Sequence, residues 1–197
     1  MKASVIFKYS QLYDKILRKV HYGRKRTSIL KPSEIPNYIE DVRRLWGNNG
    51  ERIMAELVKI TTLKWEEDTI YCYIVGDSIP FPDPLTVPAY RGMPDYFVDI
   101  LIHELIERLF LQSVNGAKMQ LVWNYFEENY RKELRITKNH IPVHAIYTHI
   151  MLKFFNEDRL NRERMWISYL PAYKRSWDIV YKKGYKEIIQ KFREIVK

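Results

Sequence analysis

The chain has 197 residues, of which 46% are hydrophobic and 14% aromatic, so it is long enough to bury one well-filled core. Its single cysteine, Cys72, excludes an internal disulfide and a zinc site made of thiolates. No segment approaches the roughly 20 apolar residues of a membrane span, and the apolar stretch near Met1 is too short for a signal peptide. We therefore expect a single cytoplasmic domain over residues 1–197, with no membrane association.

The net charge of +9 favours nucleic acid or another polyanion as a partner. Basic residues cluster at positions 15–19, 24–26 and 182–186. The alternative is a solvated surface rich in charged residues, which is typical of heat-adapted proteins. We prefer this alternative, because no nucleic-acid-binding motif accompanies the charge.

The first 65 residues are predicted to be helical. Apolar residues recur at helical spacing over residues 10–20, 34–46 and 51–63, and the break at residues 48–50 separates the last two helices. We expect the first helix to end at residues 21–23, where a glycine follows.

Residues 68–75 are the strongest strand candidate, because β-branched and aromatic residues dominate them. Cys72 lies in this run, which favours a small core residue over a nucleophile. Three prolines between residues 80 and 84 then force an extended connection. Residues 85–87 predict a second, short strand, and Pro88 indicates that this strand lies at the edge of the sheet.

Residues 95–112 predict one buried amphipathic helix. His103 and Glu107 are four residues apart and share a face of this helix, while Glu104 lies about 100° around it. Two metal ligands and a neighbouring carboxylate are what a zinc hydrolase requires from one helix, since the carboxylate can act as general base. The alternative is a buried polar triplet that pairs with Arg or Lys across the core.

Two further helices are predicted over residues 117–136 and from about His140 to Phe155. Pro142 is tolerable only in a first helical turn, which is why we place the start of the second helix near His140. The remaining residues, 156–197, contain two or three helical patterns that are expected to cover the core. The organisation is thus a helical part (1–65), a sheet with the metal-site helices (66–155) and C-terminal helices (156–197).

Three of the five histidines lie in the helix that begins near residue 140. His140 and His144 are four apart and share a face, Tyr147 falls near the same face, and His149 points roughly away. Two helices therefore each carry a metal-competent pair at the same spacing, and neutral imidazole is the commonest metal ligand among side chains.

The helix with His103, Glu104 and Glu107 resembles the helix of the zincin metallopeptidases, whose usual form is His-Glu-x-x-His, with Glu107 here in place of the second histidine. The stretch from residue 85 to residue 144 resembles a group of microbial proteins with a zincin-like fold. The resemblance implies an α+β, mostly helical fold with a small sheet that ends in an edge strand before the His-Glu helix. It also implies that residues 85–90 hold extended substrate by strand addition. The alternative is a strand that only completes a small sheet.

We expect His103, Glu107 and either His140 or His144 to bind one zinc ion. If both histidines of the later helix bind, four protein ligands close a tetrahedral site, and a structural metal is favoured over a catalytic one. If only one binds, the other can donate a hydrogen bond to a tetrahedral oxyanion or position the substrate.

Glu104 is the expected general base. Tyr147 is a further candidate donor at the catalytic site, although a buried core tyrosine is the preferred interpretation. Asp99 lies one turn before His103 and could orient its imidazole, or it could be an ordinary acid in the first part of the helix. Glu127 and Glu128 are reserve ligands, since one branch of the zincins carries its third ligand at that interval.

These patterns predict a zinc-dependent hydrolase, foremost a metallopeptidase that acts on a peptide or protein substrate. The alternative is a non-catalytic binding protein, metal-stabilised or metal-free, whose basic surface contacts nucleic acid or a protein partner. The substitution Glu104→Gln separates them, because it abolishes hydrolysis in the first case and leaves binding unchanged in the second.

Overall fold

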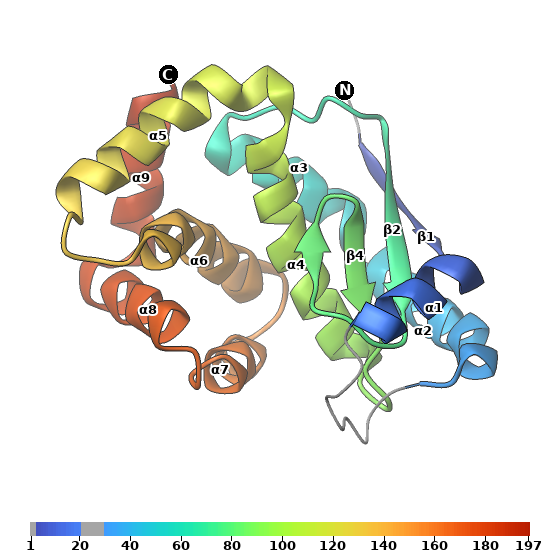
Figure 1. Cartoon of the computed structure of the whole chain (residues 1–197). Helices are drawn as coiled ribbons and strands as arrows, with labels where there is room; N and C mark the ends of the chain where they lie inside the picture. Colours follow the sequence, from blue (N-terminus) through green and yellow to red (C-terminus); the bar gives the residue numbers. More distant parts are fainter. Residues whose placement is uncertain (1–2, 21–29) are drawn as a thin grey trace. The chain divides into compact units, whose positions relative to one another are not determined.

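The computed structural model describes residues 3–20 and 30–197, and Figure 1 traces their helices and strands along the chain. Contacts divide the chain into two compact units. Of the described residues, the sheet unit comprises 3–20, 30–52 and 67–108, and the helical unit comprises 53–66 and 109–197. Helices predominate over a small sheet, so the predicted α+β class is confirmed, while its zincin-like character stays a prediction.

The sheet unit is built on a four-stranded mixed sheet with the strand order β1-β2-β4-β3. Its strands are β1 (Ser4–Lys8), β2 (Thr69–Val75), β3 (Phe81–Pro82) and β4 (Leu85–Pro88). β1 and β4 run parallel to β2, while β3 pairs antiparallel with β4. Parallel neighbours require a long connection. Between β1 and β2 the described chain forms α1 (Gln11–Val20), the short 3₁₀ helix η1 (Pro32–Glu34), α2 (Ile35–Gly47) and α3 (Gly50–Thr61).

Successive side chains of a strand point to opposite faces of the sheet. Both faces of this sheet carry aromatic side chains, and helices cover both. On one face, Tyr73 of β2 packs edge-on against Tyr13 of α1, with ring centres 5.4 Å apart. On the other face, Phe7 of β1 contacts Phe97 of α4 (Pro94–Leu111), with ring centres 6.1 Å apart. α1 and α4 therefore lie on opposite faces of the sheet, an arrangement that Figure 1 shows.

The helical unit continues from the end of α4. Its elements are most of α3, the end of α4, η2 (Ser113–Asn115), α5 (Gly116–Asn129), α6 (Arg135–Phe154), α7 (Glu157–Trp166), α8 (Pro171–Lys183) and α9 (Tyr185–Val196). α6 is buried along most of its length and packs against α8 and α9. Phe110, in the last turn of α4, stacks on Phe192 of α9 with ring centres 5.5 Å apart. These contacts make α6 the central helix of the unit.

Local sequence explains several helix boundaries in the helical unit. The Asn156 side chain caps α7 by accepting a hydrogen bond of 3.0 Å from the Arg159 backbone N–H. Pro171 begins α8, where the missing N–H would have no partner within the helix. Gly184 separates α8 from α9 with a φ of 89°, a conformation that L side chains rarely adopt.

Most predicted elements are confirmed to within two residues: α1, α2, α3, β2 and α4. Three C-terminal helices are present, in agreement with the helical patterns after residue 156. The predicted end of the first helix at residues 21–23 lies outside the described part of the chain. Neither β1 nor β3 is predicted from the sequence, because both are short and β1 pairs with a strand more than 60 residues away.

The prediction that residues 85–87 form an edge strand is wrong. β4 lies inside the sheet, where Thr86 is paired with Tyr73 of β2 on one side and with Phe81 of β3 on the other. Pro88 is tolerated because it is the last residue of the strand. The strand addition that the zincin resemblance implies cannot occur at Thr86, because its backbone pairs on both sides.

The predicted helix over residues 117–136 is wrong beyond residue 129. α5 ends at Asn129, whose side-chain amide donates a hydrogen bond of 2.8 Å to the Tyr125 carbonyl. The chain then turns, and the Glu133 backbone N–H donates to the Tyr130 carbonyl at 2.9 Å. Side-chain hydrogen bonding to the last turn of a helix competes with its continuation, which explains the early end.

The predicted start of the next helix near His140 is also wrong, since α6 begins at Arg135. Pro142 consequently lies inside the helix and not in its first turn. An interior proline removes one backbone hydrogen bond and disfavours a helix by about 3 kcal/mol. The extensive burial of α6 outweighs this local cost. Sequence periodicity does not report how much of a helix is buried, so it could not predict this outcome.

In the part of the chain that the structure describes, no helix combines the length and the apolar character needed to cross a membrane.

Candidate metal centre

α4 positions the first predicted ligand pair, His103 and Glu107. The helix has no internal glycine or proline, and apolar residues such as Leu101 and Leu105 are fully buried along it. His103 Nε2 lies 3.8 Å from the Glu107 carboxylate, one turn further along the same face. The His103 side chain is 8% exposed and that of Glu107 is 26% exposed, so the pair lies where a buried helix meets solvent.

Glu104, the predicted general base, is also buried, with an exposed fraction of 5%. Its carboxylate acts on Cys72 of β2, whose thiol pKa is raised by burial and, to a lesser degree, by this negative charge. A thiol whose pKa is raised is a poor nucleophile at neutral pH. Cys72 is fully buried, which confirms that it is a core residue.

Arg108 anchors the helix next to the ligand pair. Its guanidinium donates to both carboxylate oxygens of Glu67, at 3.0 and 2.8 Å, and to the Asp83 carboxylate at 3.0 Å. It also donates to the Pro82 carbonyl at 2.8 Å. A planar guanidinium with several acceptors holds a single geometry, so this clamp ties the C-terminal part of α4 to the chain segments beside β2 and β3.

α6 positions the second predicted pair, and the tautomer of His140 follows from its contact. His140 Nδ1 lies 2.8 Å from the Ile136 carbonyl oxygen, one turn earlier in the same helix. A carbonyl can only accept, so Nδ1 carries the proton and Nε2 keeps its lone pair. Histidines that bind metals usually hold their other ring N–H in this manner, so His140 is prepared to act as an Nε2 ligand.

His144 is enclosed by α8. Its Nδ1 lies 2.7 Å from Ser176 Oγ, and the Ser176 hydroxyl proton is directed to the Tyr173 carbonyl at 2.8 Å. His144 Nδ1 is therefore the donor to Ser176. The imidazole stacks on Trp177 at 4.1 Å with an interplanar angle of 9°. His144 is thus more deeply packed than His140, although the two ring centres lie only 5.4 Å apart.

Tyr147, the second predicted catalytic residue, is completely buried and packs edge-on against Trp177, with ring centres 6.1 Å apart. This environment favours the core tyrosine over the catalytic donor. Asp99 is fully buried in α4, one turn before His103.

His149 faces away from His140 and His144, as the helical spacing predicts. Its Nε2 lies 2.8 Å from one oxygen of Glu56, in α3, and Lys153 Nζ lies 2.6 Å from the other oxygen. His149 therefore belongs to a separate ion-pair cluster and is not a candidate ligand.

The reserve ligands Glu127 and Glu128 are exposed residues near the end of α5. Glu127 forms an ion pair with Lys138 of α6. An exposed carboxylate that already pairs with a lysine is a weaker candidate for a metal ligand than a buried one.

Sequence reasoning does not find the groups that orient these histidines. Ser176 is 32 residues from His144, and Glu56 is 93 residues from His149, so neither contact leaves a local pattern. The contact of His140 with the Ile136 carbonyl could have been predicted from the sequence, because the backbone carbonyl one turn earlier is within reach of a helical histidine.

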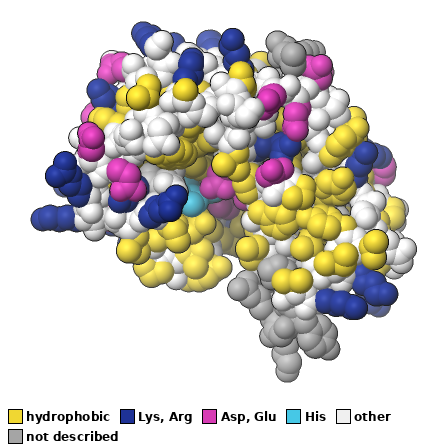
Figure 2. All heavy atoms as spheres, turned by 45° about the horizontal axis from the view of Figure 1, so that its top comes forward, with side chains coloured by type: hydrophobic (Ala, Val, Ile, Leu, Met, Phe, Trp, Pro, Cys, Tyr) yellow, Lys and Arg dark blue, Asp and Glu magenta, His cyan; other side chains and the backbone are white. Residues whose placement is uncertain are grey.

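The basic residues do not form one continuous surface on the face shown in Figure 2, where lysine and arginine side chains alternate with acidic and hydrophobic ones. Arg18 is bound to Asp14 and to the Leu30 carbonyl, and Lys183 lies 3.6 Å from Glu187. Residues 24–26 lie outside the described ranges. Pairing of this kind supports a solvated surface, and a nucleic-acid partner stays a prediction.

No protein-family model, curated protein or solved structure matches the chain. The zincin resemblance therefore rests on the residues of α4 and α6 alone.

Proposed function

We propose that this protein is a zinc-dependent hydrolase of peptide or amide bonds, with His103, Glu107 and His140 as metal ligands and Glu104 as general base. One observation carries the proposal: the Ile136 carbonyl holds His140 Nδ1–H, which leaves Nε2 with a lone pair for a metal. The spacing of His103 and Glu107 on one face of α4 supplies the complementary pair.

The donor types fit zinc. Two imidazoles and one carboxylate are a set that could hold a metal ion. Zinc accepts such a set in catalytic sites that keep one position open for water or substrate. We assign His140 and not His144, because His144 is fully buried and covered by the Trp177 ring.

A zinc ion held by His103, Glu107 and His140 would lower the pKa of a bound water and polarise the substrate carbonyl. Glu104 accepts a proton from the attacking water and returns it to the leaving amine, as the general acid–base residue of the site. Its burial excludes water from around the carboxylate and strengthens its electrostatic interactions. His103 and Glu107 are fixed by the anchored helix, so the reacting groups need little reorganisation.

Metal analysis of untagged protein, purified without chelator and then incubated with zinc, tests the ligand set. We expect about one zinc per chain in the wild type and loss of zinc in His103→Ala and in His140→Ala. The matched control is His149→Ala, on the same helix but bound to Glu56, which should retain the metal. Zinc lost from His144→Ala as well would favour the four-ligand structural site and contradict the catalytic assignment.

Hydrolysis of a quenched fluorescent peptide mixture by the zinc-loaded protein tests the base. Glu104→Gln should lower turnover by about 10²-fold or more and retain the metal. The matched control is Glu128→Gln, the same change at an exposed position of α5, and it should leave turnover unchanged. Wild-type turnover that survives in Glu104→Gln would rule out the proposed mechanism, and a chain that binds no metal would point to the non-catalytic binding protein.

A further inference from the structure

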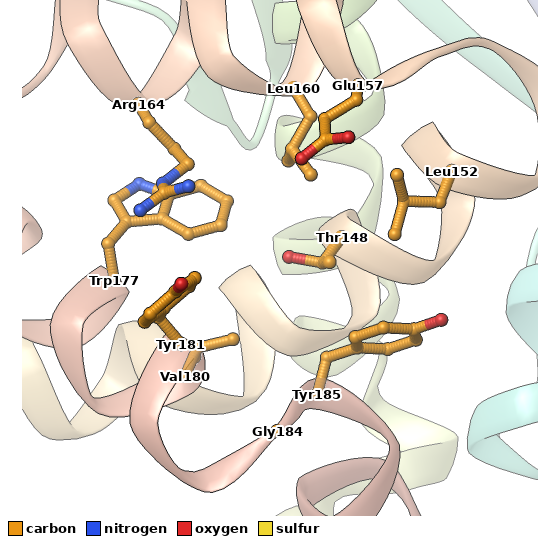
Figure 3. Close-up of a pocket in the computed structure, with 10 residues that line it drawn as sticks. All are labelled: Thr148, Leu152, Glu157, Leu160, Arg164, Trp177, Val180, Tyr181, Gly184 and Tyr185. Carbon is orange, nitrogen blue, oxygen red and sulfur yellow. The ribbon is translucent and has the colours of Figure 1, made fainter.

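The helical unit contains a pocket of about 250 Å³ that α6, α7, α8 and α9 enclose together. Figure 3 shows the side chains that line it. Its walls are mainly apolar, with Leu160 and Val180 buried and the rings of Tyr181 and Tyr185 on the opposite side from Leu160. None of the four proposed metal-site residues lines this pocket.

Arg164 of α7 brings a positive charge to one end of the pocket. Its guanidinium carbon lies 5.8 Å from the centre of the Trp177 ring and 5.6 Å from the centre of the Tyr181 ring. Its hydrogen-bond acceptor is the Asn161 side chain, at a long 3.3 Å. Within residues 3–20 and 30–197, no carboxylate forms an ion pair with Arg164, so its guanidinium keeps donors for a ligand.

Trp177 adds an aromatic wall beside this charge. The ring is 4% exposed, and its Nε1–H is buried without a hydrogen-bond acceptor among the described residues. In Figure 3 the Arg164 side chain reaches over the Trp177 ring, and the six-membered edge of the indole is turned toward the other residues that line the pocket.

We propose that this pocket binds a small aromatic monocarboxylate. The ligand carboxylate accepts hydrogen bonds from the Arg164 guanidinium, whose several N–H donors match the two oxygens of a carboxylate. The aromatic ring lies between Leu160 and Tyr181, where apolar contact and ring stacking stabilise it.

Size and charge narrow the ligand class. Pockets for drug-sized ligands span about 300–1,000 Å³, so a pocket of about 250 Å³ suits a ligand of one or two rings. Glu157 lines the same pocket, two helical turns before Arg164 on α7. Its negative charge repels a second carboxylate, which favours a monocarboxylate and orients it with its acid group toward Arg164.

Calorimetric titration with 2-naphthoate tests the proposal, with chelator present so that a metal plays no part. We expect wild-type protein to bind, and Arg164→Gln to bind at least about tenfold more weakly, because a charge-assisted hydrogen bond is lost. Arg175→Gln is the matched control, since Arg175 pairs with Glu133 outside the pocket, and its affinity should stay within about twofold of wild type.

Two further measurements identify the binding mode. The neutral analogue 2-naphthamide should bind more weakly than 2-naphthoate and should not distinguish wild type from Arg164→Gln. Leu152→Trp, a substitution at a partly exposed wall residue, should fill the pocket and weaken 2-naphthoate at least about fivefold. Equal affinities of wild type and Arg164→Gln for 2-naphthoate, or no binding to wild type at about 5 mM, would overturn the proposal.

Discussion

Asp14 of α1 is a buried carboxylate that joins three parts of the sheet unit. It accepts hydrogen bonds from the Gly76 backbone N–H at 2.7 Å, from Arg18 Nε at 2.9 Å and from the Tyr9 hydroxyl at 3.1 Å. Burial raises the pKa of Tyr9, and the negative charge of Asp14 raises it further. Because the carboxylate is satisfied on both oxygens, its removal leaves buried donors without an acceptor.

Asp14→Ala should therefore lower the free energy of unfolding by about 2–4 kcal/mol. Asp41→Ala is the matched control, because Asp41 forms an exposed ion pair with Arg44 on α2, and its effect should stay below about 1 kcal/mol. Urea unfolding followed by circular dichroism measures both. Similar losses in the two variants would show that the buried contacts of Asp14 contribute no more than a surface pair.

Glu56 makes stability depend on pH. Burial by itself raises the pKa of its carboxyl group, but hydrogen bonds from Lys153 and His149 outweigh burial and hold the pKa below its ordinary value of 4.5. A lowered pKa in the folded state contributes stability at pH values above the ordinary one, and that contribution is lost as the pH falls through the folded-state pKa.

Glu56→Gln should accordingly destabilise the protein at pH 7, by about 1 kcal/mol, and the difference from wild type should shrink as the pH is lowered below 4.5. Urea unfolding of both proteins at pH 7 and pH 3 provides the comparison. A difference that stays constant over this range would contradict the role assigned to the ionised carboxylate.

At the scale of elements, the backbone conformation of Gly184 allows α8 to end and α9 to begin at the next residue. Its φ of 89° and ψ of 124° belong to a region that residues with a Cβ avoid. Gly47, at the end of α2, has no atom within 4 Å of an added Cβ and no such constraint on its backbone. The two glycines therefore respond oppositely to the same substitution.

Gly184→Ala should destabilise the protein by about 1–3 kcal/mol, while Gly47→Ala should be neutral or stabilising by up to about 1 kcal/mol. Thermal unfolding of the two variants beside wild type gives the comparison. If Gly184→Ala unfolded at the wild-type temperature, the connection between α8 and α9 would not require the left-handed backbone.

Local sequence patterns predict the positions of some helices and strands but not of others. The helices α1 to α4 and strand β2 follow from periodicity, since each is long enough for its apolar residues to repeat. Periodicity does not predict the boundary between α5 and α6. The apolar pattern continues past Asn129, where α5 ends, and proline is normally excluded from a helix interior, where Pro142 lies. Burial of α6 against α8 and α9 overrides both local signals.

At the scale of the whole molecule, zinc binding should appear as a change in the stability of the folded chain. A ligand that binds only the folded chain stabilises it by about 2.7 kcal/mol at a free concentration of 100 times its dissociation constant. Zinc bound by its assigned ligands would therefore stabilise the folded chain.

Saturating zinc should raise the unfolding temperature of wild type and of His149→Ala, but not of His103→Ala or His140→Ala. Differential scanning calorimetry with and without zinc measures the shift. An equal shift in all four proteins would place the zinc elsewhere on the chain and refute the assigned ligands.

The sequence by itself determined the features that depend on neighbours along the chain: the amphipathic helices, the buried strand with Cys72, and the four-residue spacing of His103 with Glu107 and of His140 with His144. The tertiary structure alone decided the features that depend on distant partners. The internal position of β4, the pairing of β1 with β2, the burial of His144 under Trp177 and the pocket at Arg164 are of this kind. The physical reason is that side-chain periodicity reports which face of an element is buried, whereas it carries no information about which element covers that face.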